Sequence, residues 1–310
     1  MPQVANSIYL TRTEELFYCK IKVKLPEHYG ESLLNECFAI MQEVDTLYNS
    51  YTEGSYFNTI NANAGQWVDT DFNTVQLLKV LKVIWQCTNG AFDPTAMPLI
   101  KGWGFYNDLN DTLIPSETEI ETFLQDVDFS EVQIDGTRVK IGANQELITG
   151  AFIKAFAVDQ VIARLKQLDV KEVLINAGGS SICALSTSED HWRLDIPHPV
   201  EQSHSLLNLS LQNSSFSLSS TSKYDRLING KRYSHILNSK TGYPSQSLQV
   251  GVLTDSAFLG DVLSTALFSI DAKDFNTVVE QLGKHYSFSA YHIDKQYQYY
   301  RFNPKHIMAL

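Results

Sequence analysis

The segment Thr254-Asp-Ser-Ala-Phe-Leu-Gly-Asp-Val-Leu-Ser-Thr-Ala-Leu-Phe268 has the pattern of a helix. Thr254 or Asp255 can cap it, because a short side chain with an oxygen atom accepts hydrogen bonds from the free N–H groups of a first turn. Apolar residues then recur at helical spacing, at Phe258, Leu259, Val262, Leu263, Ala266 and Leu267.

Within this apolar pattern stand Asp261 and, four residues later, Thr265. Residues four apart lie on one face of a helix, so the carboxylate and the hydroxyl point in the same direction. A buried carboxylate is costly unless a positive group meets it, and the next turn of this helix offers no Lys or Arg. Two oxygen ligands at this spacing would suit Mg²⁺ or Ca²⁺. The alternative for an isolated D-x-x-x-T pattern is a helix face that touches solvent.

The rest of the chain predicts an α+β fold, because helices and antiparallel hairpins mix without regular βαβ alternation. We expect one large domain over residues 1–310, with mixed, mostly antiparallel sheets and flanking helices. The expected helices cover 31–47, 71–87, 116–124, 150–168 and 273–284. The expected strands cover 16–25, 173–180, 182–187, 192–197, 205–211, 215–221, 287–293 and 297–302, with a hairpin over 132–141 that turns at Asp135-Gly136.

Two segments lack the regular apolar spacing of a helix or a strand. Residues 48–61 are rich in polar and aromatic side chains, and residues 91–105 combine two prolines and two glycines with aromatic residues. The second segment is too apolar for a free loop, so we expect it to line a site. Asn89-Gly90 ends the helix before it, and Asn229-Gly230 predicts a turn.

Composition excludes several classes of function. The 310 residues carry a net charge of −11 without a cluster of Lys and Arg, which argues against nucleic acid and anionic membranes as partners. The four cysteines lack C-x-x-C spacing, so neither a zinc site nor a disulfide framework is indicated. We find no apolar run of transmembrane length and no leader at Met1, and therefore expect a cytoplasmic protein or an exported one whose leader has been removed.

Taken singly, the motifs that could carry chemistry also have plain structural interpretations. Gly178-Gly179 ends a strand where a ligand could approach, or simply forms a tight turn. His235 can be a hydrogen-bonding residue, Lys154 can lie in water, and Asp93 before a proline fits a turn. The serines from Ser219 to Ser222 lack a G-x-S-x-G elbow, which argues against a serine nucleophile.

The order of the motifs along the chain is more specific. They are Ser50-Tyr51 with Ser55 and Asn61, Phe92-Asp-Pro-Thr95 with Pro98-Leu99 and Trp103-Gly-Phe105, Gly150 with Lys154, Ala157 and Asp159, Asn176-Ala-Gly-Gly179, Thr221-Ser222 with Tyr224, His235-Ile236 with Thr241-Gly242, and Asp261 with Thr265. In this order, from about residue 9 to 269, the chain resembles the ApbE family, the FAD:protein FMN transferases.

The resemblance implies that FAD is the substrate and that a divalent cation, Mg²⁺ or Ca²⁺, assists. FMN would pass to a Thr or Ser hydroxyl of a target protein, with release of AMP. The metal would be held by Asp261, Thr265 and a backbone oxygen of Ala151. Lys154 would lie close to the diphosphate, and His235 near the phosphates, where it orients them or handles a proton. The other expected contacts of the flavin nucleotide are Tyr51, Phe92, Asp93, Gly178, Gly179 and Ile236.

The sequence departs from the family pattern at several positions. Tyr9-Leu10-Thr11 keeps only the threonine of Met-Gly-Thr, and Lys223 replaces a glycine. Ile148-Thr149-Gly150-Ala151 stands where the family has D-L-G-G and so lacks its acidic residue, and Ser180 and Asn238 replace two further aspartates. Three interpretations therefore stay open: an FMN transferase, a hydrolase that cleaves FAD to FMN and AMP, and a flavin-binding homologue without catalysis.

Overall fold

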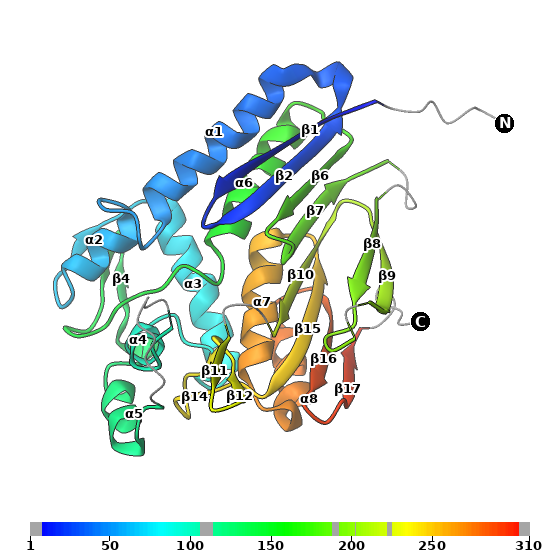
Figure 1. The fold of residues 1–310 in the computed structure, drawn as a ribbon. Helices are drawn as coiled ribbons and strands as arrows, with labels where there is room; N and C mark the ends of the chain where they lie inside the picture. Colours follow the sequence, from blue (N-terminus) through cyan, green and yellow to red (C-terminus); the bar gives the residue numbers. More distant parts are fainter. Residues whose placement is uncertain (1–7, 106–113, 188–191, 202, 222–224, 304–310) are drawn as a thin grey trace.

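The computed structural model describes residues 8–105, 114–187, 192–201, 203–221 and 225–303. Within these residues, an eight-stranded sheet runs through the molecule in the order β1-β2-β6-β7-β10-β15-β16-β17, and every neighbouring pair is antiparallel (Figure 1). Its strands are β1 (Tyr9–Leu16), β2 (Cys19–Pro26), β6 (Val173–Ala177), β7 (Ser181–Leu185), β10 (Ser214–Ser220), β15 (Ser247–Thr254), β16 (Ser289–Asp294) and β17 (Tyr299–Phe302).

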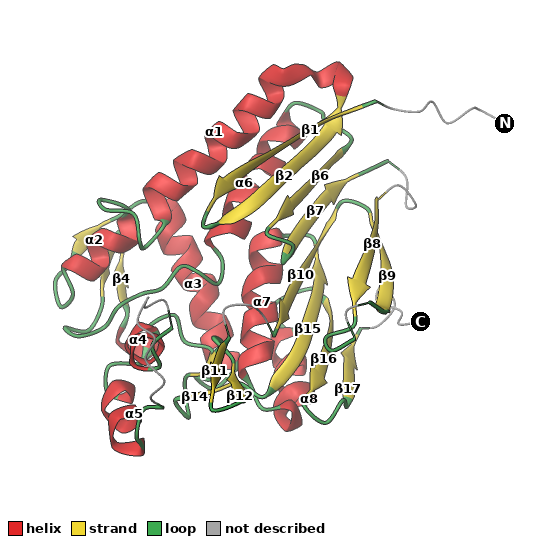
Figure 2. Ribbon diagram, viewed as in Figure 1, coloured by secondary structure: helices red, strands yellow, loops and turns green. Residues whose placement is uncertain are grey.

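Helices cover one face of this sheet, and the hairpin of β8 (Trp192–Pro197) and β9 (Ser205–Leu211) lies against the other (Figure 2). The helices are α1 (Gly30–Tyr48), α3 (Phe72–Cys87), α6 (Ile153–Gln167), α7 (Ala257–Ser269) and α8 (Phe275–Leu282). The sheet alternates accordingly: Phe216 of β10 packs toward the hairpin, while Ser217 lies against Gly260 of α7. This arrangement confirms the predicted α+β class with antiparallel sheets.

The first predicted strand, 16–25, is wrong at its start. Leu16 ends β1, Phe17 and Tyr18 form the turn with φ of 52° and 58°, and β2 begins at Cys19. Two aromatic residues in the left-handed region are unusual, and no Gly or Asn marks the turn in the sequence.

The predicted helices 31–47 and 71–87 are confirmed as α1 and α3, and the helix 116–124 as α5 (Glu117–Leu124), which Ser116 and Glu119 begin with a capping box. The cap predicted for the helix that became α7, Thr254 or Asp255, is wrong. The Ser256 side chain caps this helix instead, because it accepts a hydrogen bond from the N–H of Leu259.

Both segments predicted as irregular contain short helices, α2 (Tyr56–Ala62) and α4 (Met97–Gly102). The hairpin of β4 (Gln133–Asp135) and β5 (Arg138–Lys140) turns at Gly136-Thr137 rather than at Asp135-Gly136, since Asp135 pairs with Arg138. The turn at Asn229-Gly230 is confirmed between β11 (Arg226–Ile228) and β12 (Lys231–Tyr233). The remaining strands are β3 (Val68–Asp69), β13 (Leu237–Asn238) and β14 (Tyr243–Pro244), and the 3-10 turns are 27–29, 129–131 and 272–274.

All four cysteines are free, as predicted. Among the helices in the described parts of the chain, none combines the length and the apolar character needed to cross a membrane.

Candidate functional site

The centre of the site is an ion pair between two helices. Lys154 lies in the first turn of α6 and Asp261 in the middle of α7, and these helices pack together. The Lys154 Nζ atom lies 2.5 Å from Oδ2 of Asp261, and the two side chains are only 16% and 5% exposed. No positive partner for Asp261 stands near it in the chain, because that partner lies more than 100 residues away, on another helix.

Burial dominates the electrostatics of this pair. It raises the pKa of the Asp261 carboxyl, and the Lys154 ammonium acts in the opposite direction. In such surroundings the interaction between charges is less screened than in water, so a phosphate placed here would interact strongly with Lys154.

A second carboxylate aligns the two helices. Asp159 of α6 accepts hydrogen bonds from the Ser256 hydroxyl (2.6 Å), the Ala257 N–H (2.7 Å) and the Phe258 N–H (3.0 Å), and so caps the N-terminus of α7. Burial raises the pKa of Asp159, and these hydrogen bonds oppose the shift. The structure therefore places this motif residue in the scaffold that brings Lys154 to Asp261.

The residues expected to hold a cation lie close to this pair along the chain. Ala151 precedes α6, and Thr265 lies one turn after Asp261. In the described residues, neither the Thr265 hydroxyl nor the Ala151 carbonyl forms a hydrogen bond with another residue. The described residues contain no group of three or more His, Cys, Asp and Glu side chains that could hold a metal. A cation here would therefore depend on one carboxylate together with hydroxyl and carbonyl oxygens, a hard donor set that fits Mg²⁺ or Ca²⁺.

The segment that carries Tyr51 is fixed to the start of α6. The Ser50 N–H donates to Thr149 Oγ1 (3.0 Å), and the two buried hydroxyls lie 3.1 Å apart. The Asn61 side chain donates to the Leu147 carbonyl and accepts from its N–H. Tyr51 itself is 41% exposed and meets Tyr18, from the β1–β2 turn, edge to face. An exposed aromatic residue thus follows directly after the contact with the segment that leads into α6.

Gly178 and Gly179 form the exposed turn between β6 and β7, with φ of 68° and 75°. A Cβ atom at Gly178 would lie 3.1 Å from the Cys19 sulfur. Burial raises the pKa of the Cys19 thiol, and the charges of Lys154 and Asp261 also act on it. Cys19 therefore packs against the glycine turn, a contact that the sequence did not indicate.

The Phe92-Asp93 block lies in the protein interior. Phe92 and Asp93 are buried, and the Asp93 carboxylate accepts from the N–H and hydroxyl of Thr95 and from the N–H of Phe129. Burial raises the pKa of Asp93, and these hydrogen bonds act against that shift. The block touches the lead into α6 through a hydrogen bond from the Ile148 N–H to the Pro94 carbonyl. The side chain of Asp93 thus orders the segment beside the site.

His235 and Ile236 are half-buried and follow the β11–β12 hairpin. His235 Nδ1 lies 2.9 Å from Oδ1 of Asp225, a carboxylate that the sequence interpretation missed. The Ser239 N–H donates to the Ala91 carbonyl, which joins this region to the Phe92 block. No described contact joins His235 directly to Lys154 or Asp261. Ser222, Lys223 and Tyr224 lie outside the described residues.

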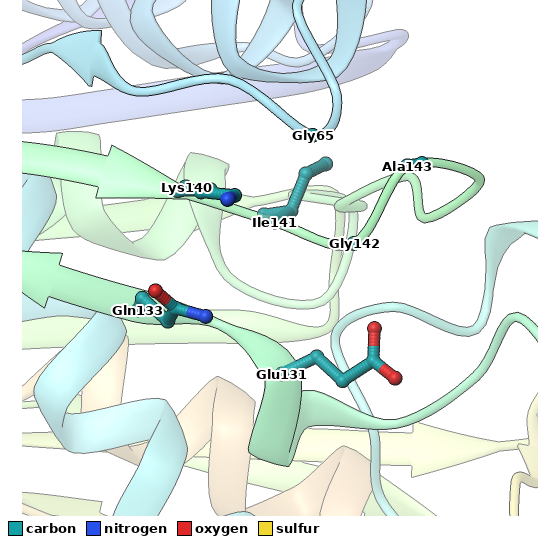
Figure 3. A pocket seen from close by; sticks show the side chains of 7 residues that line it. All are labelled: Gly65, Glu131, Gln133, Lys140, Ile141, Gly142 and Ala143. Carbon is teal, nitrogen blue, oxygen red and sulfur yellow. The ribbon is translucent and has the colours of Figure 1, made fainter.

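A cavity of about 330 Å³ lies elsewhere, beside the small β3-β5-β4 sheet (Figure 3). It is lined by Gly65, Glu131, Gln133, Lys140, Ile141, Gly142 and Ala143. None of the predicted site residues lines it, so the site rests on the ion pair and its surroundings.

The ApbE family model matches residues 17–288 of this chain. The FAD:protein FMN transferase of Klebsiella pneumoniae strain 342 is 28% identical over 260 residues, which cover 81% of this chain and 79% of that protein. The FAD:protein FMN transferase of Rhodobacter capsulatus is 27% identical over 225 residues, or 71% of this chain, and the match spans only 43% of that protein.

Two crystal structures share the fold. The ApbE protein of Thermotoga maritima superimposes with a TM-score of 0.86 at 22% identity, covering 96% of this chain and 97% of that one. The flavinyl transferase ApbE of Pseudomonas stutzeri gives a TM-score of 0.81 at 24% identity, covering 97% and 96%.

Proposed function

The chain belongs to the ApbE family, and from this premise we propose that it is a metal-dependent FAD:protein FMN transferase whose reaction centre is the Lys154–Asp261 pair. The observation that carries the proposal is this buried cation and carboxylate, 2.5 Å apart at the junction of α6 and α7. The curated relatives named FAD:protein FMN transferase support the reaction type.

The reaction exchanges one phosphate bond for another. The oxygen of a Thr or Ser hydroxyl on the acceptor protein attacks the phosphorus on the FMN side of the FAD diphosphate. A P–O bond forms, the P–O bond to the AMP half breaks, AMP leaves, and the hydroxyl proton passes to a base. Negative charge develops on the phosphoryl oxygens, so the site has to supply positive charge and a proton acceptor.

Lys154 supplies the positive charge. Its ammonium is held by Asp261 within a mostly buried region, and we place the diphosphate beside it. A divalent cation, when bound, would neutralise further charge on the phosphoryl oxygens, and Asp261, Thr265 and the Ala151 carbonyl would hold it.

The remaining residues bind and orient the substrate. Tyr51 offers an exposed ring for the flavin nucleotide, and the exposed Gly178-Gly179 turn lets a ligand approach the backbone closely. Phe92 and Ile236 complete the apolar side, with Asp93 ordering the block that carries Phe92. His235 is the residue we place at the phosphates, as proton acceptor.

The proposal is tested by incubating the protein with FAD and Mg²⁺, with and without an acceptor domain that carries a Thr, and following AMP and acceptor mass. We expect AMP together with an acceptor that is heavier by one FMN, and an unmodified mass when the acceptor Thr is replaced by Val. AMP without acceptor would instead establish the hydrolase. FAD binding without AMP in either sample would leave a flavin-binding protein, which the neutral residues Ile148, Ser180 and Asn238 would explain.

A further inference from the structure

The carboxylate of Asp225 holds His235 through two contacts. Its Oδ1 atom accepts a hydrogen bond from the His235 backbone N–H (3.2 Å) and lies 2.9 Å from Nδ1 of the same residue. The Asp225 side chain is 1% exposed and the His235 side chain 20%. One oxygen atom therefore fixes both the backbone and the ring of His235, within a nearly dry environment on the carboxylate side.

The hairpin explains why these residues meet. Arg226 pairs with Tyr233 across β11 and β12, so the residues directly outside the hairpin, Asp225 on one side and Ser234-His235 on the other, lie together. Arg226 donates a hydrogen bond to the carbonyl of Trp103, the residue that directly follows α4, and so fixes the base of the hairpin to that segment. Arg232 lies 3.7 Å from the second carboxylate oxygen. Asp225 is thus held from both sides.

The contact determines which ring nitrogen carries the proton. A carboxylate only accepts hydrogen bonds, so the Nδ1 atom facing Asp225 has to be the donor when the imidazole is neutral. The lone pair is then on Nε2, the nitrogen on the opposite side of the ring. That nitrogen can take a proton, and the carboxylate stabilises the imidazolium that results.

We propose that Asp225 is a positioning residue, which holds His235 in the Nδ1–H tautomer and leaves Nε2 as the proton acceptor for the attacking hydroxyl. The role in the reaction rests on the proposed function, whereas the tautomer itself does not. The proton balance is simple: the hydroxyl proton moves to Nε2 as the P–O bond forms, and it leaves to water or to the departing AMP phosphate.

The tautomer is tested by NMR of ¹⁵N-histidine-labelled protein at pH 8.5, with the His235 signals assigned by their loss in His235→Gln. We expect Nδ1–H with an unprotonated Nε2 in the wild type, and a shift toward Nε2–H in Asp225→Ala, because the acceptor that fixes the proton on Nδ1 is then lost and histidine side chains in water favour the Nε2–H form. This measurement needs neither FAD nor an acceptor. An Asp225→Ala protein that keeps the wild-type tautomer would overturn the proposal.

The second arm uses Asp225→Asn, which keeps size and an acceptor oxygen but loses the charge. We expect kcat for FMN transfer to fall about 10²-fold with KM for FAD unchanged, because only the imidazolium formed during the reaction needs the charge. The matched control is Asp169→Asn, an exposed carboxylate paired with Lys171 far from the hairpin, which should keep the wild-type kcat. Wild-type kcat in Asp225→Asn would contradict the role in catalysis. If the wild type itself transfers no FMN, the proposed function fails, while the NMR result still decides the tautomer.

Discussion

At the scale of single residues, the candidate site is centred on a buried carboxylate that is neutralised by a lysine from another helix. Burying one partner of such a pair without the other is strongly unfavourable, because the charge left behind loses its hydration without compensation. The Lys154–Asp261 pair therefore serves the fold as well as the substrate, and removing either side chain has consequences for stability that can be measured apart from activity.

Replacing Lys154 by Met should lower the free energy of unfolding by about 3 kcal/mol at pH 7. The double variant Lys154→Met/Asp261→Asn removes the stranded charge and should recover most of that loss. Urea denaturation of the wild type, Lys154→Met, Asp261→Asn and the double variant forms the double-mutant cycle. A single variant as stable as the wild type would show that the ion pair does not persist in solution.

A buried histidine makes the free energy of unfolding depend on pH. His292 of β16 is fully buried against the rings of Phe275 and Tyr300, and neither ring nitrogen has a hydrogen-bond partner among the described residues. Burial lowers the pKa of His292 to about 4 from its ordinary 6.5, an effect that the charge of Asp294 opposes. The unfolded chain takes up this proton first, so the stability that the neutral ring contributes is complete above pH 6.5 and is lost as the pH falls toward 4.

The pH dependence is testable with His292→Leu. Between pH 7 and pH 4 the wild type should lose about 3 kcal/mol more unfolding free energy than the variant does. Chemical denaturation at several pH values gives both curves. Parallel curves for the two proteins would mean that His292 is solvated or hydrogen-bonded in the folded state.

At the scale of helices and strands, periodicity predicted most elements but not what they touch. The apolar stripes of α1 and α3 and the capping box of α5 are local signals, and the structure confirms them. The β1–β2 turn was missed because Phe17 and Tyr18 adopt left-handed conformations that aromatic residues rarely take.

For the candidate site, too, local patterns could be predicted from the sequence and contacts between distant residues could not. Helical spacing placed Asp261 and Thr265 on one helix face but left a face that touches solvent as the alternative, and the resemblance added the cation, Lys154 and Ala151. Asp225 was missed, although the Asn229-Gly230 turn was predicted and would have placed it opposite Ser234, next to His235. The alignment of α6 with α7 by Asp159 could not be predicted, since it depends on a contact between residues 97 positions apart.

The close packing of β15 and β16 also provides a prediction. A Cβ atom at Gly251 would lie 2.3 Å from the ring of Tyr291 and 2.8 Å from the ring of Phe216, both buried. Gly251→Ala should therefore lower the unfolding free energy by about 1–3 kcal/mol. The second substitution, Tyr291→Leu, opens space beside position 251. The double variant Gly251→Ala/Tyr291→Leu should therefore lose less unfolding free energy than the two single variants do in sum, by at least about 0.5 kcal/mol. Strict additivity in denaturation experiments would mean that the ring of Tyr291 does not restrict position 251.

At the scale of the whole molecule, one face of the sheet carries the helices that meet at the Lys154–Asp261 pair, while the β8–β9 hairpin closes the other face (Figure 1). Loops from widely separated parts of the chain reach the same region: the β1–β2 turn, the Tyr51 segment and the β6–β7 turn. The fold gathers a charged pair, an exposed ring and a glycine turn that the sequence holds far apart, and we propose that together they bind a dinucleotide and its diphosphate.

The most direct test of the account is the rate of AMP release from FAD by Asp261→Asn, measured across Mg²⁺ concentrations in the presence of the acceptor domain. We predict a metal-dependent rate for the wild type and a rate at least about 10²-fold lower for the variant. Asp271→Asn, an exposed carboxylate near the end of α7, should behave as the wild type. A thermal midpoint measured for each protein separates loss of chemistry from loss of fold. Wild-type turnover in a folded Asp261→Asn protein would contradict the central claim that the Lys154–Asp261 pair is the reaction centre.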